Sequence, residues 1–348
     1  MTTPSSTPST PPSAPPSASV RVPDDQDGVS RGNTHARGDS GLDIGVYVPQ
    51  IAMSYADMLH RARRCEELGI DSLWLFDHLC GPGASQLDSM EAWTLATALL
   101  SNTEQLRIGH MVLCNQFRHP VLLAKMATTL DQISSGRLHL GIGSGSIESE
   151  HELGGFDWGD FADRSARLAE TLEILHQAFG SGVVEHTGPH YTVRSIPIKP
   201  GAVQQPRPPI VVGGVGERYT LPLVARYADV WNVPTYALGE IERKWSVLRS
   251  ICADIGRDPS TIVMSVEAVM ALAPDDSALS DTRMLAEKRF GGPGFGLHKG
   301  GLVGTPSMVV ERLGQLRDLG CGQVVLFTHD RASDTTLELL ALEVIPKL

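Results

Sequence analysis

Short apolar runs alternate with longer segments of helical spacing from Leu42 to the end of the chain. Runs rich in β-branched and aromatic residues predict strands. Eight such runs occur, at residues 42–48, 72–76, 106–109, 138–141, 209–212, 228–231, 263–272 and 323–327. Apolar residues at helical spacing predict helices between them, at residues 55–68, 120–133, 161–179, 219–226 and 306–319.

This alternation predicts right-handed strand–helix–strand units and therefore a parallel sheet. Eight strands close a (β/α)8 barrel, whereas five or six would indicate an open doubly wound sheet. Two stretches break the rhythm: residues 183–207 predict a hairpin, and residues 273–304 are rich in glycine. Long insertions in a barrel usually cover the mouth of the active site, where the strands end.

The first 40 residues have a different composition from the rest. Residues 1–19 consist almost entirely of Thr, Pro, Ser and Ala, and residues 20–40 stay polar. Such a segment has too little apolar surface to offset the entropy cost of ordering it. We expect a disordered tail over residues 1–40 and a single barrel domain over residues 42–348. The tail does not have the pattern of a secretory signal.

Charge and cysteine content argue against several classes of partner and site. The formal net charge of −11 makes nucleic acids and anionic membranes poor partners, so a small-molecule substrate is expected. The five cysteines are scattered without a CxxC pair, and no histidine cluster has zinc-ligand spacing. We therefore expect reduced thiols in a cytoplasmic protein, no metal site and no membrane span.

Residues directly after the strands of a barrel are the first candidates for catalysis. Asp77 and His78 follow the second predicted strand, and imidazole suits proton transfer near neutral pH. A loop histidine bonded locally to its neighbouring aspartate is the plainer interpretation of the same pair.

Two glycine-rich loops suggest a cofactor. The run Gly141-Ile142-Gly143-Ser144-Gly145-Ser146 would let a planar ring or a phosphate approach the backbone. The run Gly213-Gly214-Val215-Gly216 leads into a helix, where free N–H groups and the helix dipole attract anions. A plain turn is the alternative for this second run. Three nearby cations are interpreted as solvated surface groups: Arg118, Arg218 and Lys299.

Several blocks together resemble one family. Asp77-His78-Leu79, Phe117-Arg118-His119-Pro120, Gly136-Arg137-Leu138, the two glycine runs, residues 225–232 and residues 256–259 occur in the order found in luciferase-like monooxygenases. The likeness extends over residues 42–348. The Asp-His pair after the second strand is similar to the branch that uses the deazaflavin coenzyme F420, whereas flavin users tend to carry Glu-His-His.

The resemblance implies a set of site residues. Asp77 and His78 would lie beside the deazaflavin, with a non-prolyl cis peptide at Met111-Val112 supporting the ring. Cys114, Asn115, Gly143, Gly145 and Ser146 would surround the ring, and Gly213, Gly214 and Gly216 would hold the phosphate. Sugar-phosphate dehydrogenases of this family carry a glutamate acid at the position of Ser146, so the resemblance argues against a sugar-phosphate substrate.

These observations predict a coenzyme F420-dependent oxidoreductase that transfers hydride to or from a small organic substrate. His78 would carry the substrate proton, while Asp77 would orient His78 or bind the cofactor. The alternatives are an FMN-dependent monooxygenase supplied by a separate reductase, and a flavin- or F420-binding protein without turnover. Family resemblance also implies a homodimer.

Overall fold

The computed structural model describes residues 41–348. The prediction made for residues 1–40 lies outside the described residues.

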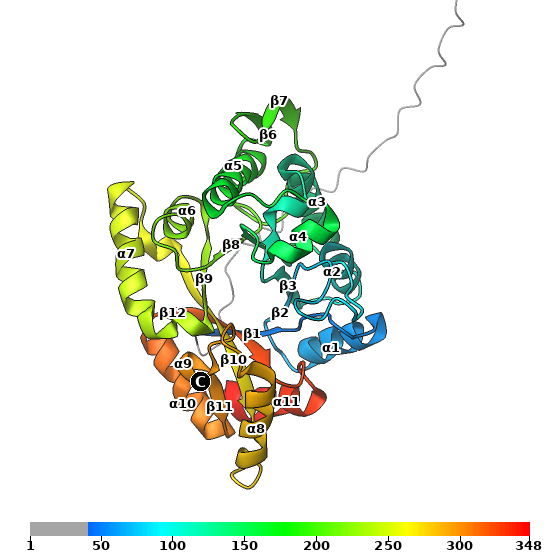
Figure 1. Ribbon diagram of the computed structural model, residues 1–348, viewed down its shortest axis with the longest axis vertical. Helices are drawn as coiled ribbons and strands as arrows, with labels where there is room; N and C mark the ends of the chain where they lie inside the picture. The colour runs from blue at the N-terminus through cyan, green and yellow to red at the C-terminus, as the bar shows by residue number, and fades with distance from the viewer. Residues whose placement is uncertain (1–40) are drawn as a thin grey trace, which may run out of the picture. The chain divides into compact units, whose positions relative to one another are not determined.

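Eight parallel strands form a closed ring at the centre of the described region (Figure 1). They are β1 (Asp43–Tyr47), β2 (Ser72–Leu75), β3 (Arg107–His110), β5 (Leu138–Gly143), β8 (Ile210–Gly213), β9 (Val230–Pro234), β10 (Val263–Leu272) and β12 (Cys321–Thr328). The ring closes because β10 pairs with β9 on one side and with β12 on the other. The predicted (β/α)8 barrel is confirmed, and each of its strands coincides with a predicted run.

Alternation along each strand separates two environments. On β10, Met264, Val266 and Ala268 join the core between strands and helices. The intervening residues point to the barrel axis, where the Ser265 hydroxyl donates to Gln323 Oε1 on β12 at 2.9 Å. This two-residue period follows from the pleat of a strand. A polar residue at an odd-numbered position of β10 is therefore inside the barrel.

Helices surround the ring (Figure 1). They are α1 (Tyr55–Glu67), α2 (Ala92–Leu100), α3 (Pro120–Ile133), α5 (Phe161–Gly180), α6 (Thr220–Tyr227), α7 (Ile241–Asp254), α10 (Pro306–Asp318) and α11 (Asp334–Leu339). The prediction missed α2, α7 and α11. The start of α1 illustrates local control: Ser54 and Asp57 each accept the other's backbone N–H, which satisfies two amides that a helix end leaves unpaired.

The two predicted interruptions differ in position. The antiparallel hairpin β6 (Val183–Thr187) and β7 (Thr192–Pro197) is present. It follows a helix, α5, so its connection belongs to the end of the barrel opposite the mouth. Residues 273–304 follow β10 and therefore lie at the mouth. They contain α8 (Leu279–Phe290), α9 (Leu297–Gly300) and β11 (Leu302–Gly304), which extends the sheet beside β10.

The remaining elements are short. They are β4 (Leu113–Cys114), α4 (Glu148–Gly154), the 3-10 turns η1 (Asn115–Phe117), η2 (Thr235–Glu240), η3 (Pro259–Thr261) and η5 (Ile345–Lys347), and the π-helical turn η4 (Leu340–Val344). Of these, β4, η1 and α4 follow β3 and β5 directly, so they shape one side of the mouth.

Candidate active site

A cavity of about 230 Å³ opens at the carboxyl ends of β2, β3, β5 and β8. Nine of the twelve predicted site residues line it: Asp77, His78, Met111, Val112, Cys114, Gly143, Gly145, Ser146 and Gly213. The other three, Asn115, Gly214 and Gly216, are not part of the lining. The cavity therefore lies where the sequence places the chemistry, at the mouth of the barrel.

Asp77 is held by two partners at the end of β2. Its carboxylate accepts a bidentate pair of hydrogen bonds from Arg118, at 2.7 and 3.0 Å, and one from the Cys114 N–H at 2.8 Å. Burial lowers the pKa of Arg118, but the Asp77 and Glu91 carboxylates raise it by more. The interpretation of Arg118 as a solvated surface group is wrong, because its side chain is only 10% exposed and neutralises a buried carboxylate.

His78 is oriented by a different carboxylate. Its Nδ1 lies 2.8 Å from Glu150 Oε2, and the other Glu150 oxygen accepts the N–H groups of Leu79 and Cys80. Because a carboxylate accepts and the imidazole N–H donates, Nε2 remains as the nitrogen available to the cavity. Asp77 makes no hydrogen bond to His78 within residues 41–348, so Glu150 orients the imidazole.

A thiol and a second imidazole meet on the same wall. Cys114 Sγ lies 3.4 Å from His151 Nε2, while His151 Nδ1 lies 2.8 Å from the carbonyl oxygen of Ile147. The carbonyl can only accept, so Nδ1 donates to it and Nε2 is an acceptor; the single thiol hydrogen is shared between Nε2 and Gln116 Oε1, which also lies at 3.4 Å. Burial raises the pKa of Cys114 to about 12, so the sulfur stays protonated. This pair fixes α4 against β4.

The back wall of the cavity is backbone packed against backbone. The Met111–Val112 peptide bond is cis, as the resemblance implies. A Cβ added at Gly143 would come within 2.7 Å of Val112 Cγ2, and one at Gly141 would collide with the His110 carbonyl oxygen. Glycine at both positions lets β5 approach this bulge closely.

The second glycine loop runs from β8 to α6. Gly214 has a φ of +116°, which glycine adopts without strain, and its N–H donates to the Asn232 carbonyl oxygen at 3.0 Å. Within the described part of the chain, the amides of residues 215–219 donate to no protein acceptor. Unpaired amides at a helix start are the donors that an anion requires. The phosphate role of this loop stays a prediction.

Two further findings concern the whole described region. None of its helices is both long and apolar enough to cross a membrane. All five cysteines are free thiols, and no group of three or more His, Cys, Asp or Glu side chains in residues 41–348 has the arrangement of a metal site.

Comparison with known proteins identifies the family. The sequence model of the luciferase-like monooxygenases matches residues 33–290. The chain belongs to the luciferase-like monooxygenase family. Two relatives are F420-dependent glucose-6-phosphate dehydrogenases, from Amycolatopsis mediterranei and Microbacterium testaceum. They are 33% identical over 175 residues and 30% identical over 225 residues.

The matched segments are partial. They cover 49% and 64% of this chain, and 50% and 66% of those two relatives. Solved structures share the luciferase-like barrel over 88% of the chain. One is the F420-dependent tetrahydromethanopterin reductase of Methanopyrus kandleri (TM-score 0.74, 19% identity, 99% of that chain). Another is an F420-dependent secondary alcohol dehydrogenase with an F420–acetone adduct (TM-score 0.75, 19% identity, 98% of that chain).

Sequence reasoning missed two residues of this luciferase-like site, Glu150 and His151. Both lie in α4, a helix too short to show periodicity. They follow a glycine loop at a strand end, which is the position where a barrel carries functional groups. An acid and an imidazole a few residues past Ser146 were the available signal.

Proposed function

We propose that this luciferase-like protein is an oxidoreductase that uses coenzyme F420 to transfer hydride to or from a small organic substrate. The observation that carries the proposal is the His78–Glu150 pair, which lines a cavity beside the cis peptide at Met111–Val112. An oriented imidazole beside a ring-sized cavity is the arrangement that coupled hydride and proton transfer requires.

The residues present fit a flat ring with polar edges. Met111, Val112 and Leu113 supply an apolar wall, and a Cβ at Gly143 would intrude on the same space. The unpaired amides of residues 215–219 suit a phosphate group. When bound, the deazaflavin would supply the carbon that accepts or donates the hydride. Asp77, neutralised by Arg118, would hold the polar edge of the ring.

His78 would act on the substrate proton. Because the Nδ1–H group of His78 donates a hydrogen bond to Glu150, the imidazole Nε2 can accept a proton from a substrate hydroxyl or return it to a substrate oxygen. Glu150 would stabilise the imidazolium form and fix the tautomer. The carboxylate therefore acts through His78 rather than on the substrate, and it is a positioning residue.

Names of relatives support the cofactor assignment. F420 dependence is named for relatives from Amycolatopsis mediterranei and Microbacterium testaceum, and for the hydroxymycolic acid dehydrogenase of Mycobacterium tuberculosis, which is 27% identical over 240 residues. The glucose 6-phosphate substrate of the first two does not transfer to this chain. Ser146 stands where the resemblance implies their acid, and a hydroxyl does not supply a proton near pH 7.

We also propose a cytoplasmic homodimer acting on a small molecule. The free thiols favour a reducing compartment. The dimer rests on family resemblance, and sedimentation of the purified protein tests it.

A binding titration that compares F420 with FMN tests the cofactor assignment. We expect F420 to bind at least about tenfold more tightly than FMN, which corresponds to about 1.4 kcal/mol. Absorbance then reports turnover when candidate alcohols or carbonyl compounds are added. Tighter binding of FMN, with oxygen consumption on supply of reduced flavin, would replace this proposal with the monooxygenase alternative.

One observation favours that alternative enough to keep it. Flavin-related enzymes share the fold to the same degree, for example EDTA monooxygenase from Chelativorans (TM-score 0.75, 13% identity, 88% of this chain and 93% of that chain). An FMN-dependent monooxygenase would use the same cavity together with a separate reductase. Binding of either cofactor without any turnover would favour a carrier protein.

A further inference from the structure

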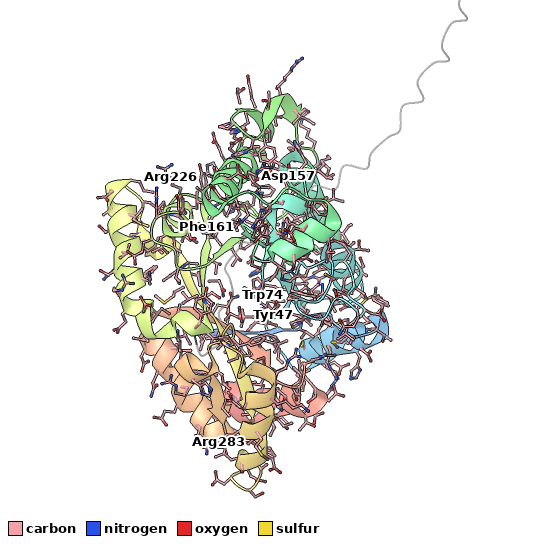
Figure 2. All side chains as sticks on the ribbon, in the orientation of Figure 1. Tyr47, Trp74, Asp157, Phe161, Arg226 and Arg283 are labelled. Atoms are coloured by element: carbon pink, nitrogen blue, oxygen red, sulfur yellow. The ribbon has the colours of Figure 1, made fainter. Side chains whose placement is uncertain are left out.

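Across the barrel from the cavity, two inward-facing side chains have no role in the proposed cofactor site. Tyr47 ends β1 and Glu267 lies on β10, at an odd-numbered and therefore inward position. Around the ring, β10 is four strands away from β3 in either direction. Glu267 therefore faces the wall that carries Met111–Val112. Figure 2 shows Tyr47 within the ring of strands, next to Trp74.

Both side chains are partly exposed although they point into the barrel. Part of the surface of each residue is therefore not covered by protein. Within residues 41–348, the Glu267 carboxyl has no hydrogen-bond or ion-pair partner, in contrast to Asp77 and Glu150 on the facing wall. A carboxyl group that is inside a barrel and partly exposed, but lacks a protein partner, is available to a ligand.

Among the described residues no cation forms an ion pair with Glu267, although the guanidinium of Arg289 in α8 lies over the Phe327 ring, 5.7 Å from its centroid. The register neighbours of Glu267 are Val325 on β12 and Pro234 on β9. The titratable groups that face it are Tyr47 from β1 and Tyr236 from η2, and the charge of Glu267 raises the pKa of both phenols in addition to their burial. Burial raises the pKa of Glu267 itself to about 7.

Aromatic rings complete this side of the mouth. Phe327 on β12 packs edge-on against Tyr47 at 4.8 Å between ring centroids, and Phe290 packs against Phe327 at 4.9 Å. Phe290 and Phe295 belong to the insertion after β10. The insertion therefore brings apolar rings next to a single carboxyl group.

We propose that Tyr47 and Glu267 form the substrate subsite, and that Glu267 selects uncharged ketones and secondary alcohols with apolar bodies over anionic substrates. This inference rests on the proposed function. The protonated carboxyl donates to a ketone oxygen, and the carboxylate accepts from an alcohol hydroxyl. An anion beside this group is repelled by the carboxylate form, which makes no ion pair among the described residues.

The charge state of Glu267 then sets which partner binds. A ketone binds the protonated form, so its affinity falls as pH rises through neutrality, and by linkage the ketone raises the titration midpoint of the carboxyl. An alcohol prefers the carboxylate and shifts the midpoint in the opposite direction. His78 keeps its role in proton transfer on the other wall.

Infrared titration of the cofactor-free protein is the first test. Its carbonyl stretch should report one carboxyl that titrates near neutrality, and this signal should be missing in Glu267→Gln but present in Glu173→Gln, an exposed control. Saturating cyclohexanone should raise the midpoint, cyclohexanol should lower it, and glucose 6-phosphate should leave it unchanged. The proposal is overturned if the titration midpoint does not change with cyclohexanone and cyclohexanol, or if it changes with glucose 6-phosphate.

Steady-state kinetics of cyclohexanone reduction, with reduced F420 supplied as the hydride donor, are the second test. In the wild type, the KM for cyclohexanone should rise with pH, while in Glu267→Gln it should stay constant because the amide always donates. Glu267→Met should raise this KM about tenfold at low pH, with kcat changed less than about threefold. An unchanged pH profile in Glu267→Gln refutes the subsite. Failure to bind F420 would refute the proposed function instead, and the infrared result would still decide the role of Glu267.

Discussion

The two sides of the barrel mouth are organised in opposite ways. On the β2–β3–β5 side, three charged or titratable groups meet partners: Asp77 meets Arg118, His78 meets Glu150, and Cys114 meets His151, while the buried Asn115 amide has no hydrogen-bond partner among residues 41–348. On the β10–β12–β1 side, Glu267 has no hydrogen-bond or ion-pair partner among residues 41–348, and the rings of Tyr47, Phe327 and Phe290 pack against one another on the same side. A wall whose titratable groups are already paired holds those groups in place before a ligand binds, as a cofactor site requires. On the opposite wall, the Glu267 carboxyl remains available to form a hydrogen bond with a ligand.

The largest effect expected concerns the imidazole of the paired wall. His78→Ala should lower turnover by about 10²–10⁴-fold, because a positioned acid–base group contributes that much, while F420 affinity stays within a few-fold. Asp77→Ala should weaken F420 binding first. Steady-state assays and binding titrations on the two variants separate these effects. Normal turnover by His78→Ala would show that the imidazole does not transfer the substrate proton. The paired wall would then have no demonstrated catalytic role.

The second prediction concerns how much the Asp77–Arg118 ion pair contributes to the free energy of unfolding. Arg118→Met leaves Asp77 buried without its cation, and removing one partner of a buried pair costs about 3–5 kcal/mol of unfolding free energy. Urea unfolding measures the loss. The control is Arg243→Met, since Arg243 is 54% exposed and pairs with Glu217 and Glu240 on the surface, where little change is expected. Equal effects in the two variants would show that Asp77 does not depend on Arg118.

The third prediction concerns the unpaired wall. The pKa of Glu267 is raised from 4.5 to about 7, so the folded state binds its proton more tightly than the unfolded state. Stability should therefore fall as pH rises through this interval and level off above it. Glu267→Gln should remove the slope and gain on the order of 2 kcal/mol over the wild type above neutrality. Chemical unfolding across the pH range tests this. If Glu267→Gln leaves the slope of stability against pH unaltered, the Glu267 carboxyl is hydrated in the folded state.

The smallest expected effect concerns the glycine loop after β8, which lies between the two walls. Gly214→Val should weaken cofactor binding by about 1–2 kcal/mol, because a side chain at a φ of +116° forces the loop away from its position beside Thr220. Gly314→Ala on α10 is the matched control, since a Cβ there meets no atom within 4 Å. Binding titrations on folded protein decide the matter, and wild-type affinity in Gly214→Val would remove the phosphate assignment.

The success of the fold prediction has a local cause. Strands and helices with one buried face repeat their apolar residues at two different periods, so all eight barrel strands and α3 were predicted from the pattern alone. The missed α2 is apolar on nearly every side, and α4 is too short to repeat. Neither helix has the one-sided pattern that periodicity detects.

The site was predicted as far as strand ends could indicate it. Asp77, His78 and the glycines of β5 follow strands directly, so their place at the mouth follows from chain order. Arg118 was misjudged because an arginine in a loop is normally solvated, and nothing in the local sequence reveals the carboxylate that it meets. Glu150 lies a few residues past the strand end, in a helix too short to show periodicity, and its partner His78 is 72 residues away.

The sequence by itself determined the barrel, its mouth and the residue types present there, because periodicity and strand ends are local properties of the chain. Only the tertiary structure decided which polar groups are paired. Closure of the ring brings Arg118 to Asp77 and Glu150 to His78, and leaves Glu267 facing them with no partner in the described residues. Hydrogen bonds and ion pairs act over a few ångströms in space, so their energies depend on contacts that separation along the chain does not encode.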